Sequence, residues 1–465
     1  MFTQLRSANF KSWRDTGQIE LRPVTGFFGT NSSGKTSLLQ MLLLLKQTAS
    51  SPDRRQVLNL GDDRSPVSLG LIRDVLYAHD LSSTLVLSYE WDATERVRPA
   101  DPTNPQAALF DAERMKFETH LTFREDQLVV EHFKYEADSN SVTMRLSKAP
   151  QSRRDPEYRI DATVRGNPDY LKRVQGRAWP LPPPAKCYGF PDEVLAYYQN
   201  AEFVLDLELE LEKQFGDRLF YLGPLRSYPE RQYTWQGSRP TDVGRTGDRA
   251  IDALLASRKA GRTTTRKRNR LGRATKWITV EEHVAAWLKD LDLLHAFEVK
   301  RIAPDADIYR VEVKRAPDAA PVLLTDIGFG VSQILPVLVL LAYAPEGSTV
   351  LLEQPEIHLH PAVQAGLADV IIETAEARRV QVVVESHSEY LLRRLQRRVA
   401  EGGIGHENVA LYFCDHDGHE SRIERLQLNL LGEIENWPAH FFGDPLGETA
   451  AIVEAGIRRK REAKP

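Results

Sequence analysis

Hydrophobic and polar residues alternate with strand-like and helix-like periods in two separate regions of the chain. In the first region, FTQLRSANF (2–10) and VTGFFG (24–29) have strand character, and the following run GKTSLLQMLLLLKQTA predicts a helix beginning at about Lys35. From residue 321 to about 428, strand-like and helix-like segments alternate again. These two regions predict an α/β fold in which helices flank a sheet.

The stretch between the two regions has a different pattern. The apolar residues Met115, Phe117, Leu121 and Phe123 share one parity, which predicts strands of a half-buried sheet. A proline-rich segment, WPLPPPAKCYGFP, separates these strands from DEVLAYYQNAEFVLDLELELEKQF, which has the pattern of one acidic helix. We therefore interpret residues 97–215 as an inserted α+β lobe.

This interpretation divides the chain into five parts. The inserted lobe interrupts the α/β domain, whose first part is 1–96, and the chain returns to that domain afterwards. The remaining parts are the return segment 216–320, the second part of the α/β domain at 321–430, and a C-terminal cap with a basic tail at 431–465.

Composition and charge narrow the class of protein. A hydrophobic share of 42% and a charged share of 27% are typical of a globular protein. The two cysteines cannot form a disulfide framework, and the N-terminus lacks the apolar core of a secretory signal. The longest apolar run, ILPVLVLLAYA (334–344), is too short to span a bilayer. We expect a cytoplasmic protein that does not enter a membrane.

A basic segment at 257–277, SRKAGRTTTRKRNRLGRATKW, stands out against the net charge of −4. It holds nine lysines and arginines and no acidic residue, so it is a candidate contact for the phosphate backbone of DNA or RNA. Its single aromatic residue, Trp277, argues against a stacking platform for single strands. A solvated loop is the alternative.

The octapeptide GTNSSGKT (29–36) matches the phosphate-binding loop G-x-x-x-x-G-K-[ST] between a predicted strand and a predicted helix. In this arrangement backbone N–H groups surround the β-phosphate of a nucleotide at a helix N-terminus. The lysine reaches the β- and γ-phosphates, and the threonine hydroxyl binds Mg²⁺. The predicted nucleotide-binding residues are Gly29, Asn31, Ser32, Ser33, Gly34, Lys35, Thr36 and Ser37.

A second candidate element is VLLEQPEIHLHP (350–361), an apolar strand that ends in an acidic and histidine-rich segment. Its first acid, Glu353, stands where a P-loop protein needs a carboxylate for Mg²⁺. Two other interpretations remain open. Glu353 and Glu356 could be an acid–base pair, or His358 and His360 could ligate a metal ion.

Several motifs occur in a characteristic order. The P-loop and a long insertion come first, GFGVSQ (328–333) follows, then the strand ending in E-x-P-E-x-x-L-H-P, and finally a strand ending in SHSE (386–389). This combination resembles the SMC/RecF/OLD branch of ABC-type ATPases, and within it the bacterial ATPases that lack the Toprim nuclease domain of OLD proteins. The resemblance implies an ABC-type P-loop head with ATP and Mg²⁺ as cofactors.

The resemblance also implies a role for each matching residue. Ser332 and the segment around it would contact the γ-phosphate held by a second protomer, so that ATP lies between two heads. Glu353 would be the acid that serves Mg²⁺ together with Thr36, and His387 would be the switch histidine at the γ-phosphate. The loop HLHP (358–361) would connect the two pockets of the dimer. No glutamine between residues 60 and 95 matches the Mg²⁺-contacting glutamine of the family.

Gln354 raises the question of how ATP would be hydrolysed. ABC-type ATPases usually have a glutamate after the first acid, and this glutamate polarises the attacking water. An amide cannot accept a proton at neutral pH, although it can orient water. We expect slow hydrolysis, with Glu356 and His387 as substitute bases, so the predicted catalytic residues are Glu353, Gln354, Glu356 and His387.

These observations favour an ATPase that dimerises or oligomerises on ATP. By analogy with its relatives, such a protein would act as a sensor or scaffold in antiphage defence or DNA repair, beside a separate effector such as a nuclease or toxin. An ATP-stabilised scaffold without useful turnover is the alternative, and a P-loop kinase is a weaker one. A nuclease site in CDHDGHES (414–421) is also weaker, because this segment has the pattern of a hairpin turn.

Overall fold

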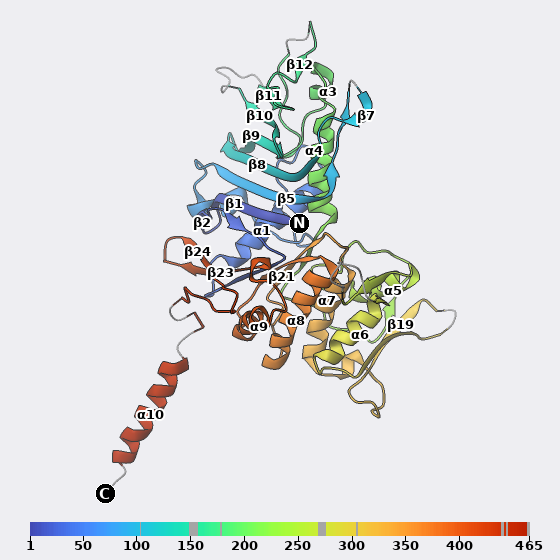
Figure 1. Cartoon of the computed structure of the whole chain (residues 1–465), viewed down its shortest axis with the longest axis vertical. Helices are drawn as coiled ribbons and strands as arrows, with labels where there is room; N and C mark the ends of the chain where they lie inside the picture. Colours follow the sequence, from blue (N-terminus) through green and yellow to red (C-terminus); the bar gives the residue numbers. More distant parts are fainter. Residues whose placement is uncertain are drawn as a thin grey trace.

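The computed structural model describes residues 1–102, 104–147, 157–176, 179–267, 276–303, 306–438, 441–442 and 445–462. Two large sheets and two sets of helices make up the body of the protein, with the antiparallel strands at one end and the helices α5 to α9 at the other (Figure 1). The predicted α/β class, with a mixed sheet flanked by helices, is confirmed.

The central sheet has the order β14-β21-β22-β4-β23-β24, in which β14 to β23 pair in parallel and β24 pairs antiparallel with β23. One strand, β22, therefore lies between the P-loop strand β4 and the strand β21 that carries the first acid. The bounds are β4 Val24–Gly29, β14 Leu219–Leu222, β21 Thr349–Glu353, β22 Gln381–Glu385, β23 Val409–His416 and β24 Ser421–Leu426.

Both faces of this sheet are buried, which explains the nearly continuous apolar runs of its strands. Leu351 and Val383 belong to one core cluster, whereas Val350 and Val382, one residue earlier in each strand, belong to the other. Helix α1 (Lys35–Ser50) lies on the first side, and its start at Lys35 confirms the prediction. The second side is covered by α7 (Phe329–Tyr343), α8 (Pro361–Arg378) and α9 (Glu389–Ala400).

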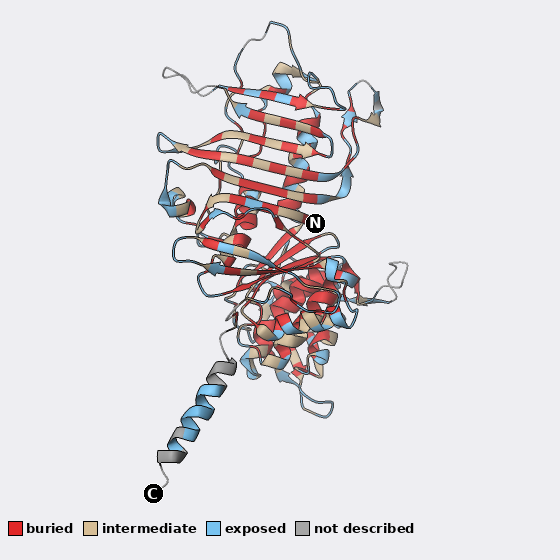
Figure 2. Ribbon diagram, turned by 60° about the vertical axis from the view of Figure 1, so that its left-hand side comes forward, coloured by how far each residue is buried: buried red, intermediate tan, exposed pale blue. Residues whose placement is uncertain are grey.

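The second large sheet is antiparallel, with the order β11-β10-β9-β8-β5-β1-β2 and with β3 also paired to β1. Buried and more exposed residues alternate along its strands (Figure 2). Its inner face packs with α1 into one apolar core. The strands are β1 Phe2–Phe10, β2 Trp13–Asp15, β3 Ile19–Glu20, β5 Leu85–Val97, β8 Ala112–Arg124, β9 Gln127–Ala137, β10 Asn140–Leu146 and β11 Tyr158–Thr163.

The strands expected in the inserted lobe are present, with Met115, Phe117 and Leu121 fully buried on β8 and Phe123 only partly buried. They do not form a separate sheet, however. β8 pairs with β5, so the strands β8 to β11 extend the sheet that begins with the N-terminal strand β1.

The single helix predicted for 192–215 is wrong. The segment forms α3 (Glu193–Tyr197), the short strand β13 (Tyr198–Gln199) and α4 (Phe203–Glu212), which continues as a π-helical turn at Lys213–Asp217. Asn200 has a φ of 62° and therefore lies in the left-handed region, which a continuous helix does not allow.

Small sheets lie at both ends of the molecule, β12 and β7 beside the antiparallel sheet and β19 beside the helices α5 and α6 (Figure 1). β18 and β19 form a hairpin that β15 and β20 extend, β16 pairs with β17, β12 pairs with β13, and β6 pairs with β7. The helices not yet described are α2 Ile72–Val75, α5 Ala250–Lys259, α6 Val280–Asp290 and α10 Pro445–Glu462. The strands are β6 Ala100–Asp101, β7 Asn104–Ala108, β12 Lys172–Arg173, β15 Tyr233–Thr234, β16 Thr263–Thr265, β17 Trp277–Thr279, β18 Ala296–Arg301, β19 Ile308–Lys314 and β20 Val322–Leu323. Within the described part of the chain, no helix has the length and apolar character needed to cross a membrane.

Candidate nucleotide-binding site

The P-loop joins the end of β4 to the start of α1, as the motif predicts. Ser32 and Gly34 have φ values of 60° and 84°, so two residues of the loop are in the left-handed region just before the helix. Gly29 has a φ of 141°, and a Cβ atom there would lie 1.9 Å from the carbonyl oxygen of Cys414 on β23. Only glycine fits this position, because the loop leaves the sheet in direct contact with the neighbouring strand.

Lys35 turns back over the loop that precedes it. Its ammonium donates hydrogen bonds to the carbonyl oxygens of Gly29 (3.2 Å) and Thr30 (2.5 Å) and to the hydroxyl of Ser33 (3.2 Å). The side chain is buried, and this burial lowers the pKa of Lys35. The loop carbonyls thus hold the charge that the motif assigns to phosphate oxygens.

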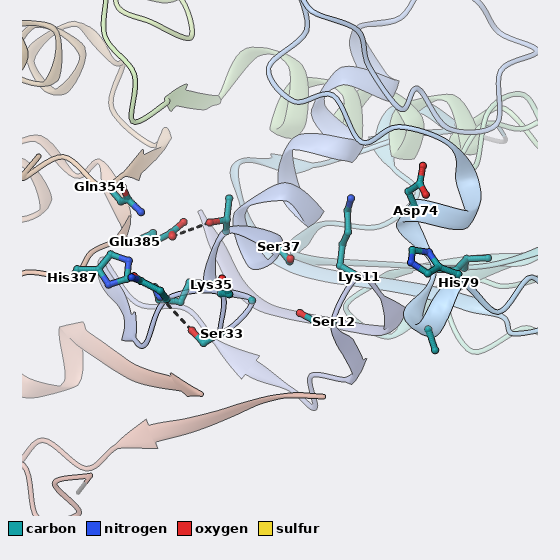
Figure 3. Close-up of a pocket in the computed structure, with 16 residues that line it drawn as sticks. Lys11, Ser12, Ser33, Lys35, Ser37, Asp74, His79, Gln354, Glu385 and His387 are labelled. Atoms are coloured by element: carbon teal, nitrogen blue, oxygen red, sulfur yellow. Dashed lines mark hydrogen bonds between the residues drawn. The ribbon is translucent and has the colours of Figure 1, made fainter. Parts of the chain in front are cut away.

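A cavity of about 670 Å³ opens above the P-loop (Figure 3). The predicted residues from Asn31 to Ser37 line it, together with Gln354 and His387. Gly29, Glu353, Glu356 and Ser332 are not among the residues that line it. The P-loop, the end of β21 and the end of β22 therefore meet at one cavity.

Glu385, at the C-terminal end of β22, is a site residue that the sequence did not indicate. It lines the cavity, and its Oε1 accepts a hydrogen bond of 2.8 Å from the hydroxyl of Thr36. Its Oε2 is buried and has no hydrogen-bond partner among the described residues. Burial and the neighbouring Glu353 carboxylate raise the pKa of Glu385 to about 7. The signal for it was the acid directly before the SHSE motif, at the end of a predicted strand.

Glu353 lies beside Glu385 in the register of β21 and β22. Its Oε2 accepts a hydrogen bond of 2.6 Å from the hydroxyl of Tyr221 on β14, and burial raises its pKa. Arg226 follows the same strand and donates to the Glu353 carbonyl oxygen at 3.5 Å. The hydroxyl of Thr36 thus bonds to Glu385, and the role of Glu353 at Mg²⁺ stays a prediction.

Arg226 places a buried positive charge behind these carboxylates. Its Nε and Nη1 atoms have no partner among the described residues, and burial lowers its pKa to about 10. The nearest opposite charges are those of Glu356 and Glu353.

Glu356 is joined to the loop after β22, SHSE (386–389), which carries the predicted switch histidine His387 and is called the switch loop below. Oε1 of Glu356 accepts a hydrogen bond of 2.6 Å from the backbone N–H of His387. Glu356 is 5% exposed, and burial raises its pKa. Burial and the charge of Lys35 lower the pKa of His387, so this imidazole is neutral at pH 7. Of the two expected substitute bases, only His387 faces the cavity.

Gln354 lies at the bend after β21. Its φ is 43°, and its backbone N–H donates to the carbonyl oxygen of Glu385 at 2.9 Å. The side chain faces the cavity (Figure 3). An amide group thus occupies the cavity wall beside Glu385 and His387.

The oxygen atoms at the start of α1 and at the C-terminal end of β22 fit a magnesium ion. Mg²⁺ prefers hydroxyl and carboxylate oxygens, which Thr36 and Glu385 provide. The orphaned Oε2 of Glu385 and its raised pKa indicate that the charge of Lys35 does not offset the burial of this carboxylate, and a bound cation would supply further positive charge.

The cavity wall opposite β22 comes from residues that the sequence did not single out. Lys11 and Ser12 lie in the turn after β1, and Asp74 and His79 lie in and after α2 (Figure 3). The backbone N–H of Lys11 donates to the Val75 carbonyl oxygen at 2.7 Å, which joins the two segments. Both segments therefore form part of the cavity wall.

Ser332 lies in the first turn of α7, which begins at Phe329. Its hydroxyl donates to the Phe329 carbonyl oxygen at 2.6 Å. The N-terminus of this helix is open to solvent at Gly328 and Phe329, and the Phe329 ring packs against Tyr228 and His358 with centroid distances of 5.5 and 5.0 Å. Ser332 is therefore outside the P-loop cavity of its own chain.

The two histidines of HLHP have separate roles in the loop. Nδ1 of His360 accepts the backbone N–H of Ala362 and caps α8, whereas the ring of His358 contacts Phe329. The segment CDHDGHES forms the turn between β23 and β24, as expected from its sequence. Thr30 of the P-loop donates to Asp415 of this hairpin at 3.1 Å.

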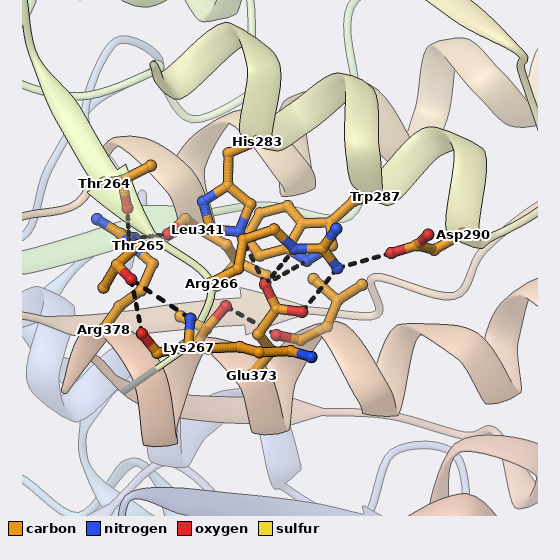
Figure 4. Close-up of polar contacts among 12 residues, drawn as sticks. Thr264, Thr265, Arg266, Lys267, His283, Trp287, Asp290, Leu341, Glu373 and Arg378 are labelled. Atoms are coloured by element: carbon orange, nitrogen blue, oxygen red, sulfur yellow. Dashed lines mark hydrogen bonds and ion pairs between the residues drawn. The ribbon is translucent and has the colours of Figure 1, made fainter. Parts of the chain in front are cut away.

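The basic segment is only partly open to an external partner. The guanidinium of Arg266 donates to both carboxylate oxygens of Glu373, each at 2.8 Å, and to Asp290 at 2.6 Å (Figure 4). Glu373 also accepts from Trp287 at 3.1 Å and lies 2.9 Å from Nε2 of His283. This charge is thus neutralised within the protein.

Two further arginines of the segment also form hydrogen bonds within the protein, one of them to a carboxylate. Arg258 donates to Glu281 and to the Val299 carbonyl oxygen, and Arg262 donates to the Tyr343 carbonyl oxygen at 2.6 Å. Residues 268–275, with three more arginines, lie outside the described residues. The predicted nucleic-acid contact stays a prediction.

Comparisons with known proteins agree with this site. Residues 249–393 match the sequence family described as "AAA domain, putative AbiEii toxin, Type IV TA system", and residues 404–452 match "Protein of unknown function (DUF3696)". A search of curated proteins gives no significant match.

Similar solved structures include heads of SMC proteins. The SMC head domain from Thermotoga maritima is 10% identical over 92% of this chain and 99% of its own, with a TM-score of 0.38. The Pyrococcus furiosus SMC head with an extended coiled coil, bound to the C-terminal domain of ScpA, is 11% identical over 98% of this chain and 99% of its own, with a TM-score of 0.43. The P-loop between β4 and α1, the order of the central sheet and the AAA-domain match together indicate a P-loop ATPase fold, and the order of the motifs resembles that of the SMC/RecF/OLD branch of ABC-type ATPases.

Proposed function

We propose that this protein binds Mg²⁺-ATP, hydrolyses it slowly and associates with a second copy of itself in the ATP-bound state. The observation that carries the proposal is the convergence of Lys35, Thr36 and Glu385 at one cavity. A lysine on loop carbonyls, a hydroxyl and a desolvated carboxylate are the groups that a nucleotide with its cation would engage.

Each of these residues has a distinct task in binding. The N–H groups at the start of α1 face the cavity and would bind phosphate oxygens, as helix N-termini do. Lys35 would leave the loop carbonyls for the β- and γ-phosphates. Thr36 and Glu385 would hold Mg²⁺, with Glu353 behind them, and the bound ion would offset negative charge on the phosphates.

Slow hydrolysis follows from the groups that could accept a proton from water. Gln354 can orient a water molecule through its carbonyl oxygen but cannot take the proton. His387 is neutral at pH 7 and lines the cavity, so it is the better placed of the two substitute bases. Glu356 is buried and already accepts the His387 N–H, which suits a role in positioning the switch loop.

Association on ATP is supported by the exposed N-terminus of α7. Gly328 and Phe329 are open to solvent, and a Cβ atom at Gly328 would meet no neighbour within 4 Å. A helix N-terminus attracts anions, so this end of α7 can approach the γ-phosphate in a facing protomer. Ser332 would turn its hydroxyl from the Phe329 carbonyl to that phosphate.

A sensor or scaffold role in antiphage defence or repair, in the cytoplasm and beside a separate nuclease or toxin, completes the proposal. It is supported by the family matched at 249–393, whose description refers to a toxin–antitoxin system. Direct contact with DNA or RNA would involve the basic charges of 257–277 that are not paired within the protein.

Size-exclusion chromatography with light scattering, with and without Mg²⁺-ATP, tests the core of the proposal. The wild type should shift to a dimer or larger assembly on ATP. Lys35→Ala should bind ATP at least 100-fold more weakly and should not shift. Lys289→Ala, which removes an exposed lysine from α6, should behave like the wild type. A wild type that neither binds ATP nor changes mass would overturn the proposal.

The second candidate function is an ATP-stabilised scaffold without useful turnover, which the amide of Gln354 favours. The two functions differ in what Gln354→Glu does. In a cycling ATPase this variant changes the lifetime of the ATP-bound assembly, whereas a scaffold keeps its partner complex at any turnover rate. Measuring assembly lifetime after ATP removal separates them.

A further inference from the structure

A cluster of Glu118, His120 and His132 lies on the antiparallel sheet, on a different sheet from the nucleotide cavity. Glu118 and His120 are two residues apart on β8, and His132 lies directly opposite His120 on β9. They alternate with the buried residues Phe117 and Phe133, so all three side chains belong to the outer face of the sheet.

The three side chains converge on a small volume. Nε2 of His120 lies 2.9 Å from Oε1 of Glu118. The rings of His120 and His132 are stacked, with centroids 4.0 Å apart and an angle of 25° between their planes. One ligand atom from each of the three residues lies within 4.8 Å of the other two.

A β-bulge beside the cluster shapes this arrangement. The register of β8 and β9 shifts between His120 and Leu121, so that Leu121 faces Val130 and Glu131 is the extra residue next to His132. Bulges change the direction of neighbouring side chains and are common at functional sites. Here the bulge lies at the point where the two histidines meet.

The surrounding lysines leave the cluster's carboxylate available. Lys134 lies directly across from Glu118 in the register of the strands, yet its ammonium, like that of Lys116, contacts Glu136. Oε1 of Glu118 is bonded to Nε2 of His120, so the carboxylate already faces the imidazole with which it would share a metal ion.

We propose that Glu118, His120 and His132 form a binding site for a divalent transition-metal ion of the Zn²⁺ class. Two imidazole nitrogens and one carboxylate oxygen suit Zn²⁺ and its neighbours, and water completes the coordination. A groove of about 620 Å³ beside His132 gives the ion and its water access from solvent. The ion would clamp β8 to β9 and stiffen the outer sheet independently of nucleotide.

Titration of the full chain with Co²⁺ and then Zn²⁺, without nucleotide, tests this site. The wild type should show the visible absorption of cobalt in a nitrogen–oxygen site, and Zn²⁺ should displace it. His132→Gln and Glu118→Gln should each weaken Zn²⁺ binding at least tenfold and lose the cobalt spectrum. Zn²⁺ should raise the midpoint of thermal unfolding of the wild type but not of these variants.

His406→Gln is the matched control, because His406 is an exposed histidine 3.3 Å from a glutamate in a different part of the fold. It should bind Zn²⁺ like the wild type. Far-UV circular dichroism checks that the cluster variants are folded. Equal Zn²⁺ affinity in the wild type and both cluster variants, or no binding by the folded wild type, overturns the proposal.

Discussion

The hydroxyl of Thr36 donates a hydrogen bond of 2.8 Å to the carboxylate of Glu385. This bond links the first turn of the P-loop helix to the end of β22, the strand that separates the P-loop strand from the strand of Glu353. The two candidate cation-binding oxygens therefore come from α1 and β22, which meet in space but are far apart in the sequence.

Replacing Glu385 by glutamine should weaken binding of Mg²⁺-ATP at least tenfold and leave Mg²⁺-free ATP nearly unaffected, because only the ion loses a charged ligand. Calorimetric titration with and without Mg²⁺ measures both. Glu407→Gln, at an exposed glutamate, is the control and should change neither affinity. If the variant loses the same affinity for ATP with and without Mg²⁺, Glu385 contacts the nucleotide itself or supports the fold and is not a ligand of the ion.

The nucleotide-free protein should lose stability as the pH rises from about 5 to 7. The pKa of Glu385 is raised from its ordinary 4.5 to about 7 in the folded state, so in this range the folded state binds more protons than the unfolded state. The free energy of unfolding should fall by on the order of 2 kcal/mol from this group. Urea unfolding at several pH values measures the slope.

Glu385→Gln should reduce that slope without abolishing it. Burial also raises the pKa of Glu208, which accepts the backbone N–H of Phe190, to about 7. Its contribution remains in the variant. A slope identical to that of the wild type would contradict the raised pKa of Glu385.

Gln354→Glu should increase the rate of ATP hydrolysis at least tenfold, because a carboxylate at this place in the cavity wall can accept the proton of the attacking water. Steady-state phosphate release measures the rate. In the wild type, His387→Ala should remove most of the residual turnover. Fast hydrolysis that persists in Glu356→Gln and His387→Ala variants would show that neither residue is the substitute base.

Gly29→Ala should destabilise the protein by on the order of 3 kcal/mol, because the new methyl group would collide with the Cys414 carbonyl and φ is 141°. Gly216→Ala is the matched control, since a Cβ there meets nothing within 4 Å. Chemical unfolding of both variants measures the difference. Equal stability of the two would mean that β4 and β23 separate easily at this point.

Features formed by residues that are close in the sequence could be predicted, whereas features that depend on contacts between distant segments could not. The P-loop and the start of α1 at Lys35 were predictable because strand, glycine turn and helix are continuous in the chain. Glu385 was not, since its role depends on β22 pairing between β4 and β21. The joining of β8 to β5 and the neutralisation of Arg266 by Glu373 also depend on partners that sequence spacing does not show.

The break in the predicted helix at 192–215 has a different cause. The apolar and acidic residues on both sides of Asn200 keep a helical pattern, so the periodicity continues while the backbone does not. The left-handed conformation at Asn200 lets Tyr198–Gln199 pair with Lys172–Arg173, a tertiary contact that outweighs local propensity.

The Lys35 ammonium donates to oxygen atoms of Gly29, Thr30 and Ser33, so these loop oxygens compete with a bound phosphate for the lysine. A nucleotide has to displace these internal acceptors, so the apparent affinity equals the intrinsic affinity reduced by the fraction of molecules whose lysine is released. Nucleotides without a γ-phosphate recover less of that cost. If the cavity binds nucleotides as proposed, these internal bonds of Lys35 would favour triphosphates over diphosphates.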